Sequence, residues 1–366
     1  MGTIKQNLAN NIETLGKFDA TDLTGTIPAA NITNSSLSDI TTIPPSTSGG
    51  DLIQTVASDP PAPDFGDIWY NSTEQKIKLK VQSIPAGTWA SAANVNTGVT
   101  SPTGLGTQSA FIKTGGENPG GRQALTESYN GTSWTEVNDL NTGRNGLAGS
   151  GISTAGIVAG GYASTGQTAF TELWDGTNWT EVGDINTGRT ILGTSGRGTQ
   201  TATLIFSGEN SGTGTKYANT ESWNGTSWTE VNDLSSATYG RFGSGTQTAA
   251  IATGGVDAPT RTLVELWDGT SWTETTEVNT PRYATNTAGT QTATLISGGA
   301  TLYSVTATEF WNGTSWTELN DLATARSASA AGGSATAAID AATPSPADTA
   351  TEEWTAATSN QSIQGS

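Results

Sequence analysis

The sequence contains neither cysteine nor histidine among its 366 residues. Their absence excludes disulfides, thiolate nucleophiles, imidazole bases and the commonest protein ligands of zinc, copper and haem iron. Hydrophobic residues make up 33% and charged residues 13% of the chain, proportions that are unusual for a helical globular enzyme. From these absences we expect no cofactor, no metal site and no catalytic activity.

Basic residues are also scarce, since 15 Lys and Arg face 33 Asp and Glu and give a formal net charge of -18. Such a field repels phosphate backbones and anionic lipid surfaces, so we expect no nucleic-acid partner. No apolar run approaches the roughly 18 residues of a membrane span. The polar start, residues 1–11, lacks the apolar core of a signal peptide. We therefore expect no membrane insertion, and synthesis in a cytoplasm.

Glycine and tryptophan are abundant instead, with 46 and 12 residues. Phrases such as SYNGTSWTEVNDLNTGR and LWDGTNWTEVGDINTGR recur along the chain, each with two aromatic residues and a Glu two positions before the first. The first aromatic residues are Tyr129, Trp174, Trp223, Trp267, Trp311 and Trp354. The second are Trp89, Trp134, Trp179, Trp228, Trp272 and Trp316. Short alternating runs around Asn-Gly or Asp-Gly predict β-hairpins, because these dipeptides tolerate the positive φ of a tight turn.

A short apolar run ending in a small-residue doublet precedes each first aromatic residue. The doublets begin at Gly115, Gly160, Gly208, Gly254, Gly298 and, in a degraded last copy, Ala341. These features occur six times only if Trp89, one period of 45 residues before Trp134, is counted with the last copy. An open sheet edge would expose unpaired backbone groups. We therefore predict that the strand around Trp89 pairs with the strand around Trp354 and closes a ring.

This order of a Gly-Gly strand, a variable loop, a Glu-x-Trp strand, a tight turn and a Trp-Thr strand resembles the kelch repeat. The resemblance covers residues 84 to 363 and implies an all-β fold, a six-bladed kelch-like β-propeller. We assign residues 84–366 to this propeller.

The N-terminal quarter has a different composition. Residues 3–16 carry Ile and Leu at helical spacing and predict a short helix, so we assign 1–45 to that helix and an extended attachment or stalk segment. A Pro/Gly/Ser linker follows at 46–64, and a β-hairpin module at 65–83. Phrases such as LTGTIPAANI and DIWYN resemble segments of tailed-bacteriophage fibres, and their combination with kelch-like repeats resembles appendage proteins of marine phages.

Acids and arginines recur with the repeats. The acids are Glu127, Glu172, Glu221, Glu265, Glu309 and Glu352. The arginines are Arg144, Arg189, Arg282 and Arg326; in the third copy Thr238 takes the equivalent position, with Arg241 nearby. A catalytic residue is needed once, so the repeated acids are interpreted as structural. The arginines either line a channel or bridge neighbouring blades to the acids, and the structural interpretation is favoured.

The loops after the doublets differ in length and content, unlike the nearly identical Trp strands. Recognition residues often lie on such loops of a rigid scaffold, and Tyr and Arg are enriched at binding hot spots. The candidate ligand- or partner-binding residues are Arg122, Tyr162, Lys216, Tyr217, Arg261 and Tyr303. Neutral drift in exposed loops explains the variation equally well.

The phage resemblance implies a virion structural protein on the particle exterior. In this hypothesis residues 1–45 bind other virion proteins, the propeller binds a host-surface ligand such as a glycan, and the chain forms a homo-oligomer, with a trimer as the first guess. One alternative is a neck, capsid or tail decoration protein with no host contact. Another is a sialidase-like glycan hydrolase, for which Tyr239, Arg241, Tyr283 and Arg282 are the candidate catalytic residues.

Overall fold

The computed structural model describes residues 54–58, 68–74, 76–79, 87–196, 198–257, 261–342, 348–356 and 361–363. The chain divides into two compact units, one of residues 1–83 with 358–366 and one of residues 84–357. The described residues of both units form strands, turns and bridges but no helix, so the described fold is all-β. The predicted helix at 3–16, the stalk and most of the linker lie outside the described residues.

The first unit contains a four-stranded sheet in the order β1-β2-β3-β35. Its strands are β1 (Gln54–Val56), β2 (Ile68–Asn71), β3 (Lys76–Leu79) and β35 (Gln361–Ile363). The expected hairpin is present as antiparallel β2 and β3, in a turn where the Asn71 side chain accepts the N–H groups of Thr73 and Glu74. β1 pairs parallel to β2, and β35 pairs antiparallel to β3.

The pairing of β35 with β3 changes the expected domain boundary. The repeats predict a single domain over residues 84–366, but the second unit ends at residue 357 and the last described strand belongs to the first sheet. A strand of three residues is too short to show an alternating pattern. The sequence pattern therefore does not predict that β35 pairs with β3.

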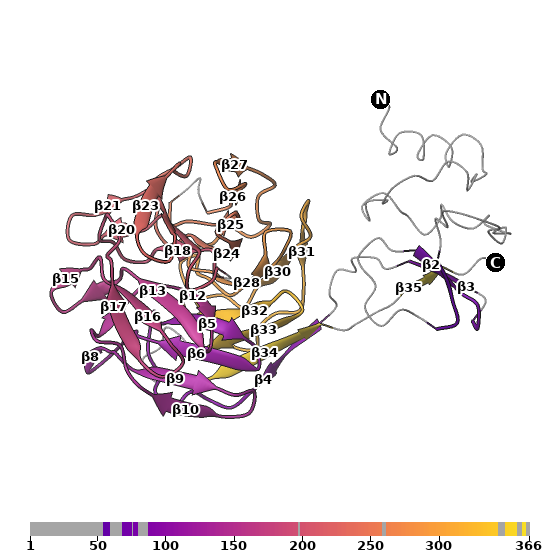
Figure 1. Cartoon of the computed structure of the whole chain (residues 1–366), viewed down its shortest axis with the longest axis horizontal. Coiled ribbons are helices and arrows are strands. Elements are labelled where there is room, and N and C mark those ends of the chain that lie inside the picture. Colours follow the sequence, from indigo (N-terminus) through magenta and orange to yellow (C-terminus); the bar gives the residue numbers. More distant parts are fainter. Residues whose placement is uncertain are drawn as a thin grey trace. The chain divides into compact units, whose positions relative to one another are not determined.

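The second unit contains, in its described part, six four-stranded antiparallel sheets (Figure 1). Their first strands are β5 (Thr103–Thr107), β12 (Ala148–Ile152), β18 (Gly193–Thr194), β24 (Phe242–Thr246), β28 (Asn286–Thr290) and β32 (Ala330–Ser334). The second strands are β6 (Ala110–Thr114), β13 (Ala155–Ala159), β19 (Thr203–Phe206), β25 (Ala249–Thr253), β29 (Ala293–Ser297) and β33 (Ala337–Ala341).

The two outer strands of each sheet carry the repeated aromatic residues. The third strands are β9 (Thr126–Tyr129), β16 (Thr171–Trp174), β22 (Thr220–Trp223), β26 (Val264–Trp267), β30 (Thr308–Trp311) and β34 (Thr351–Ala356). The fourth strands are β10 (Trp134–Val137), β17 (Trp179–Val182), β23 (Trp228–Val231), β27 (Trp272–Glu274), β31 (Trp316–Glu318) and β4 (Gly87–Ser91). β4 comes from the start of the unit and completes the last sheet.

The expected pairing of the Trp89 and Trp354 strands is present, because β4 lies antiparallel to β34 with these two residues opposite each other. In the other sheets the first and second aromatic residues face each other in the same way, as Trp174 faces Trp179 with ring centroids 5.2 Å apart. Such tilted aromatic pairs add about 0.5 to 1.5 kcal/mol beyond the area they bury. The repeated Trp residues thus form the cross-strand core of each sheet.

Each first strand contacts the first strand of the next sheet, in the order β5, β12, β18, β24, β28 and β32, and β32 also contacts β5. Hydrophobic clusters fill the spaces between neighbouring sheets; one of them joins Phe111 of the first sheet to Ile339 of the sixth. Figure 1 shows the sheets of this unit standing around a common centre. The arrangement is propeller-like.

A backbone feature corrects two of the predicted doublets. After each second strand the chain enters the left-handed region at one residue. These residues are Gly115, Gly160, Ser207, Gly254, Gly298 and Ala342, with φ between 56° and 70°. The predicted starts at Gly208 and Ala341 are therefore one residue off. The glycine pattern misled there, because Ser207 and Ala342 occupy a conformation that usually selects glycine.

Candidate functional site

The turns between third and fourth strands are short and nearly identical. In each, the side-chain oxygen of Asn or Asp accepts the backbone N–H groups two and three residues later, as Asp175 does from Thr177 and Asn178, both at 2.7 Å. These hydrogen bonds lower the pKa of Asp175. Gly176 alone supplies the positive φ, 93°.

This geometry agrees with the expectation that Asn-Gly and Asp-Gly accommodate the positive φ of the turn, and the glycine is the residue that adopts it. Among the described residues, the non-glycine positions with positive φ do not include these Asn and Asp residues. Their function in the turn is instead that of a side-chain acceptor for two backbone N–H groups. The side chains of Asn and Asp both carry an acceptor oxygen, Oδ1, so either residue fits the turn.

The variable loops lie at the opposite ends of the sheets, since they connect second to third strands. Several form small hairpins of their own: β7 (Glu117–Asn118) with β8 (Gly121–Arg122), and β20 (Glu209–Asn210) with β21 (Thr215–Lys216). A third, β14 (Tyr162–Ala163) with β15 (Gly166–Gln167), also pairs with β11 (Arg144–Asn145) of the preceding linker. These loops are therefore ordered by backbone pairing.

Arg122 and Tyr162, two of the predicted binding residues, lie against each other. The Arg122 guanidinium carbon is 4.4 Å from the centroid of the Tyr162 ring, a cation–π contact between the loops of adjacent sheets. Glu117 of the first loop also accepts a hydrogen bond from Asn145 at 3.1 Å. The first two loops are therefore connected to each other.

Lys216 and Arg261, two more of the predicted residues, make similar contacts. Lys216 donates to both carboxylate oxygens of Asp257 at 2.6 Å and lies 5.8 Å from the centroid of the Tyr239 ring. Arg261 lies 5.8 Å from the centroid of the Tyr283 ring. Burial, together with the charge of nearby Glu209, raises the pKa of Tyr239. The three predicted cations thus connect loops and linkers of neighbouring sheets.

Tyr303, by contrast, is 82% exposed, and the adjacent Leu302 is 84% exposed. Their loop is nevertheless held at its base, because Ala300 bridges to both Tyr283 and Ser304. The Ser304 hydroxyl also lies 3.0 Å from that of Ser327. Tyr217, the sixth predicted residue, is partly buried, and its backbone is bonded to Gly208 and Thr238. The structure therefore brings together some predicted residues and leaves only Tyr303 prominently exposed.

The linkers between sheets are held by buried ion pairs. The pairs are Arg144–Glu172, Arg189–Glu221, Arg241–Glu265, Arg282–Glu309 and Arg326–Glu352, with N–O distances of 2.5 to 3.0 Å. The acids also accept backbone N–H groups that follow the fourth strand of the preceding sheet, as Glu172 does from Asn141 at 2.8 Å. This agrees with the structural interpretation of the acids and favours bridging over channel lining for the arginines.

In two sheets the cation that pairs with the buried Glu comes from a different sequence position. In the fourth sheet Arg241, three residues after Thr238, reaches Glu265. In the first sheet no linker arginine is present, and Lys113 of β6 pairs with Glu127 at 2.6 Å instead. Burial lowers the pKa of Lys113, and the neighbouring Glu127 opposes that shift. Each of these buried carboxylates therefore has a cationic partner.

The sixth sheet contains one further buried acid, Asp340. Its carboxylate accepts hydrogen bonds from Asn286 at 2.8 Å and from Ser297 at 3.1 Å, as well as one from Ser329. Arg326 Nη1 is 3.7 Å from the Asp340 carboxylate, while Nη2 of the same guanidinium pairs with Glu352 at 2.7 Å. Burial raises the pKa of Asp340 despite these partners. This cluster joins the fifth and sixth sheets.

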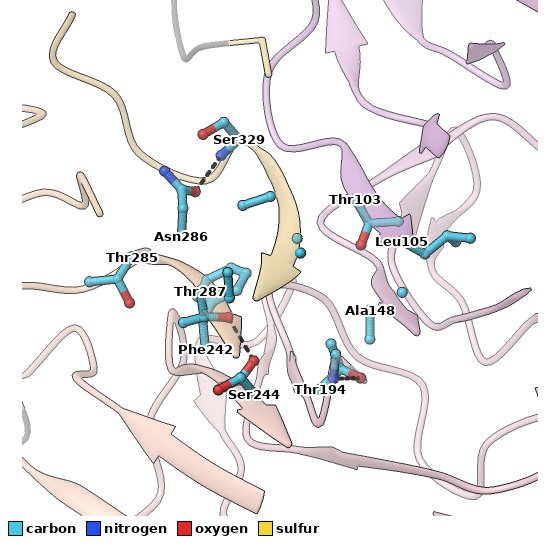
Figure 2. A pocket seen from close by; sticks show the side chains of 18 of the residues that line it. Thr103, Leu105, Ala148, Thr194, Phe242, Ser244, Thr285, Asn286, Thr287 and Ser329 are labelled. Atoms are coloured by element: carbon cyan, nitrogen blue, oxygen red, sulfur yellow. Dashed lines mark hydrogen bonds between the residues drawn. The ribbon is translucent and has the colours of Figure 1, made fainter. Parts of the chain in front are cut away.

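The first strands surround a small cavity of about 50 Å³ (Figure 2). Its lining carries hydroxyl and amide groups, including those of Thr103, Ser244, Thr287 and Asn286, and no ionisable side chain. A cavity of this size has room for a few water molecules, compared with about 300 to 1,000 Å³ for a small-molecule pocket. Its lining offers no general acid or base that could activate these hydroxyl groups.

The residues considered for sialidase-like chemistry are not available as a group. Arg241 and Arg282 are fully buried and bound to Glu265 and Glu309. Tyr239 and Tyr283 lie on the linkers, beside the cations described above. The described residues also include no cluster of three or more acids that could hold a metal ion, and no helix long and apolar enough to cross a membrane.

No protein-family model matches the chain, and no curated protein matches its sequence. The site is therefore defined by its geometry alone. Sequence reasoning missed Leu302, Asp257, Lys113 and Asp340. Lys113 and Asp340 were detectable in principle, because each interrupts an apolar second strand at the same position, two residues before the left-handed residue.

Proposed function

We propose that residues 84–357 form a six-bladed, kelch-like propeller whose ring is closed by β4. The backbone of the linkers supports this. Five hydrogen bonds of 2.7 to 3.2 Å connect one residue in each linker to the next, through Ser101, Gly146, Ile191, Gly240, Ala284 and Ala328. Ile191, which takes part in two of these bonds, has a φ of 52°, a strained value that β-branched residues rarely adopt.

Bonds between the first and last parts of the unit repeat those between internal sheets. Trp179 of β17 donates to a Thr hydroxyl on the third strand of the preceding sheet, and Trp89 donates in the same way to Thr308 at 3.1 Å. Gln200 donates to the carbonyl of Trp174, and Gln108 donates likewise to that of Trp354 at 2.8 Å. One or both of these bonds is present at each junction between consecutive sheets, including that between the sixth and the first, which supports a closed ring.

The proposed role of the protein is structural. In this proposal the chain is a fibre-like appendage of a bacteriophage virion, anchored through residues 1–45 to other virion proteins. Its propeller, exposed on the particle exterior, binds a ligand on the host surface, such as a glycan. The phage-fibre resemblance of the N-terminal segments supports the virion, and the fold supports a rigid display of loops.

The observation that carries the binding role is the Thr301–Ser304 loop tip. Leu302 and Tyr303 are almost fully exposed, on a loop fixed at its base by backbone bridges. Fixing a loop before binding lowers the entropy cost of association. Exposed aromatic and aliphatic groups on such a loop are typical contact residues. The other loops at this end, joined by Arg122, Lys216 and Arg261, act as a rigid surround.

Binding of the labelled full-length protein to a panel of intact bacterial cells tests this role. The variant Leu302→Ser/Tyr303→Ser should lose binding to cells that the wild type binds. Ile152→Ser is the matched control, because Ile152 is 55% exposed but lies at the end of β12, beside the turn at the other end of its sheet. Equal binding by both variants would refute the loop tip as the contact.

The alternatives predict other outcomes of the same assay. A decoration protein of neck, capsid or tail binds particles and no cells. A sialidase-like hydrolase releases sugar from surface polysaccharide, and the burial of Arg241 and Arg282 argues against it. The proposed homotrimer is tested by mass photometry of the chain and of a variant lacking residues 1–64. An unchanged oligomer after truncation contradicts a role for the N-terminal segment in assembly.

A further inference from the structure

Three of the turns between third and fourth strands contain the dipeptide Asn-Gly, at Asn130, Asn224 and Asn312. The two other turns of this type contain Asp-Gly, at Asp175 and Asp268. All five have the same hydrogen bonds to the side-chain oxygen. We propose that the three Asn-Gly turns are sites of spontaneous deamidation, which converts them to the acidic form already present in the other two.

The reaction needs an electrophilic side-chain amide. In the first turn, Asn130 Oδ1 accepts the N–H groups of Thr132 and Ser133, both at 2.9 Å. The same pair of 2.9 Å bonds is present at Asn224 and Asn312. Two backbone donors on one carbonyl oxygen stabilise the negative charge that develops there during attack, as they do in an oxyanion hole.

The reaction also needs an accessible nucleophile, the backbone nitrogen of the following residue. No acceptor takes the N–H of Gly131, Gly225 or Gly313 within the described part of the chain. Glycine has no Cβ to hinder the approach. Asn130 and Asn224 are exposed and Asn312 is partly buried, so water reaches the product.

The steps balance without an added reagent other than water. The Gly131 nitrogen bonds to Cγ of Asn130 and loses its proton, the bond between Cγ and the side-chain nitrogen breaks, and that nitrogen leaves as ammonia. Water then opens the cyclic imide at one of its two carbonyls. Opening at one carbonyl gives Asp, and opening at the other gives isoaspartate, whose extra backbone carbon disrupts the turn.

The fold tolerates Asp at these positions. Asp268 accepts from Thr270 and Ser271 at 2.8 Å in the geometry that Asn312 has with its own turn residues. Complete conversion to Asp adds three negative charges to the formal -18. All three lie at the end of the sheets away from the variable loops, so that end gains negative charge with time.

The fourth Asn-Gly of the chain is a built-in control. Asn145 lies in β11 and is paired with Tyr162, and the N–H of Gly146 donates to the Ser101 carbonyl at 2.9 Å. Its side-chain amide donates to Glu117, and its Oδ1 has no hydrogen-bond donor. The Asn145–Gly146 dipeptide therefore lacks both features that favour deamidation in the three turns.

Peptide mapping by mass spectrometry of the full-length protein, incubated at mildly alkaline pH, tests the inference. We expect Asn130, Asn224 and Asn312 to deamidate at least about tenfold faster than Asn145, a modest fraction of the 10²-fold or more that one oxyanion donor is worth in an enzyme. In denaturant the four sites should react at similar rates. A folded-state rate at Asn145 equal to those of the turns, or turns that stay intact while the unfolded chain reacts, would overturn the proposal.

The triple variant Asn130→Asp/Asn224→Asp/Asn312→Asp provides a second readout. It should melt within a few degrees of the wild type and elute from an anion-exchange column with the most acidic species of the aged wild type. A variant that fails to fold would contradict the claim that Asp fits these turns. Aged wild type that gains no acidic species would contradict the reaction itself.

Discussion

Trp89 lies directly opposite Trp354 in the β4–β34 pair, and their ring centroids are 5.7 Å apart. The two residues are separated by nearly the whole length of the second unit, so their pairing joins its first and last strands. The linker that follows β4 is bonded to the first sheet, since the backbone N–H groups of Asn96 and Thr97 donate to Glu127. Burial, together with a hydrogen bond between Tyr129 of the first sheet and Glu353 of β34, raises the pKa of Tyr129 to about 12.

An engineered disulfide tests this pairing. Thr88 and Thr355 are opposite each other and both are exposed, and the chain has no native cysteine to interfere. Thr88→Cys/Thr355→Cys should oxidise spontaneously and stabilise the protein by about 2 to 4 kcal/mol, an effect that a reductant reverses. Denaturant unfolding with and without reductant measures it. Ala90→Cys/Thr355→Cys, which is out of register, is the control and should cross-link poorly.

Removing one partner of a buried ion pair should be costly. Arg144 and Glu172 are 3.0 Å apart, with 0% and 1% of their side chains exposed. Arg144→Met leaves a carboxylate buried without its cation and should cost about 3 to 5 kcal/mol. Arg144→Met/Glu172→Gln should recover part of this loss, because the amide oxygen of Gln still accepts the Asn141 N–H. Denaturant unfolding of the single and double variants measures this recovery. Equal losses of stability in the two variants would show that the unpaired charge of Glu172 is not the cause of the destabilisation.

Asp340 should give the protein a specific pH dependence. Burial raises its pKa in the folded state above the unfolded value. The folded protein therefore binds this proton more tightly, and the contribution to stability is complete below the unfolded pKa and is lost as pH rises through the folded pKa. Asp340→Asn should remove this loss, so the variant should gain stability relative to wild type as pH rises.

Melting temperatures of both proteins across the acid-to-neutral range measure this difference. The groups that face Asp340 are Arg326, Glu352, Asn286, Ser297 and Ser329. An Asn side chain can still accept from Asn286 while it donates to the Ser329 hydroxyl, so the variant keeps the cluster bonded. A difference that does not change with pH would contradict the raised pKa.

Alanine substitution at two glycines of the same repeat tests whether a positive φ makes glycine necessary. Gly176 has a φ of 93°, and a Cβ there would be strained whatever space surrounds it. Gly176→Ala should therefore destabilise by about 1 kcal/mol or more. Gly183 lies in the same repeat without a positive φ, and its Cβ would meet only the Thr226 carbonyl at 3.4 Å. Gly183→Ala should be neutral or slightly stabilising in the same unfolding experiment.

The strands were predictable because large, rigid aromatic residues recur at fixed positions in each repeat. Trp-Trp pairs, the Glu two residues upstream and the Asn-Gly or Asp-Gly turns each leave a mark at fixed spacing, and each has a backbone or packing consequence in the structure. The pairing of β4 with β34 followed from counting, because a missing Trp in one copy matched a surplus one at the other end of the chain. Local geometry that depends on a single φ, as at Ser207, left no such mark.

The loops were less predictable for a physical reason. Sequence identifies a Tyr or Arg in a variable loop but not the direction of its side chain. The sequence predicts Arg122 and Tyr162 as separate contacts for a ligand, but in the structure the two side chains contact each other. Lys216 has Asp257 as its partner from a different sheet. Only the three-dimensional arrangement distinguishes such contacts from the exposed side chain of Tyr303.

Gly87 and Ala356 are cross-strand partners at the end of the β4–β34 pair. The polypeptide therefore enters and leaves the second unit at adjacent positions, and the strand that follows, β35, joins the sheet that precedes β4 along the chain. A tensile load carried by the chain segments before β4 and after β34 would enter the second unit at this strand pair. The other strands of the second unit would then carry force only after β4 and β34 had separated.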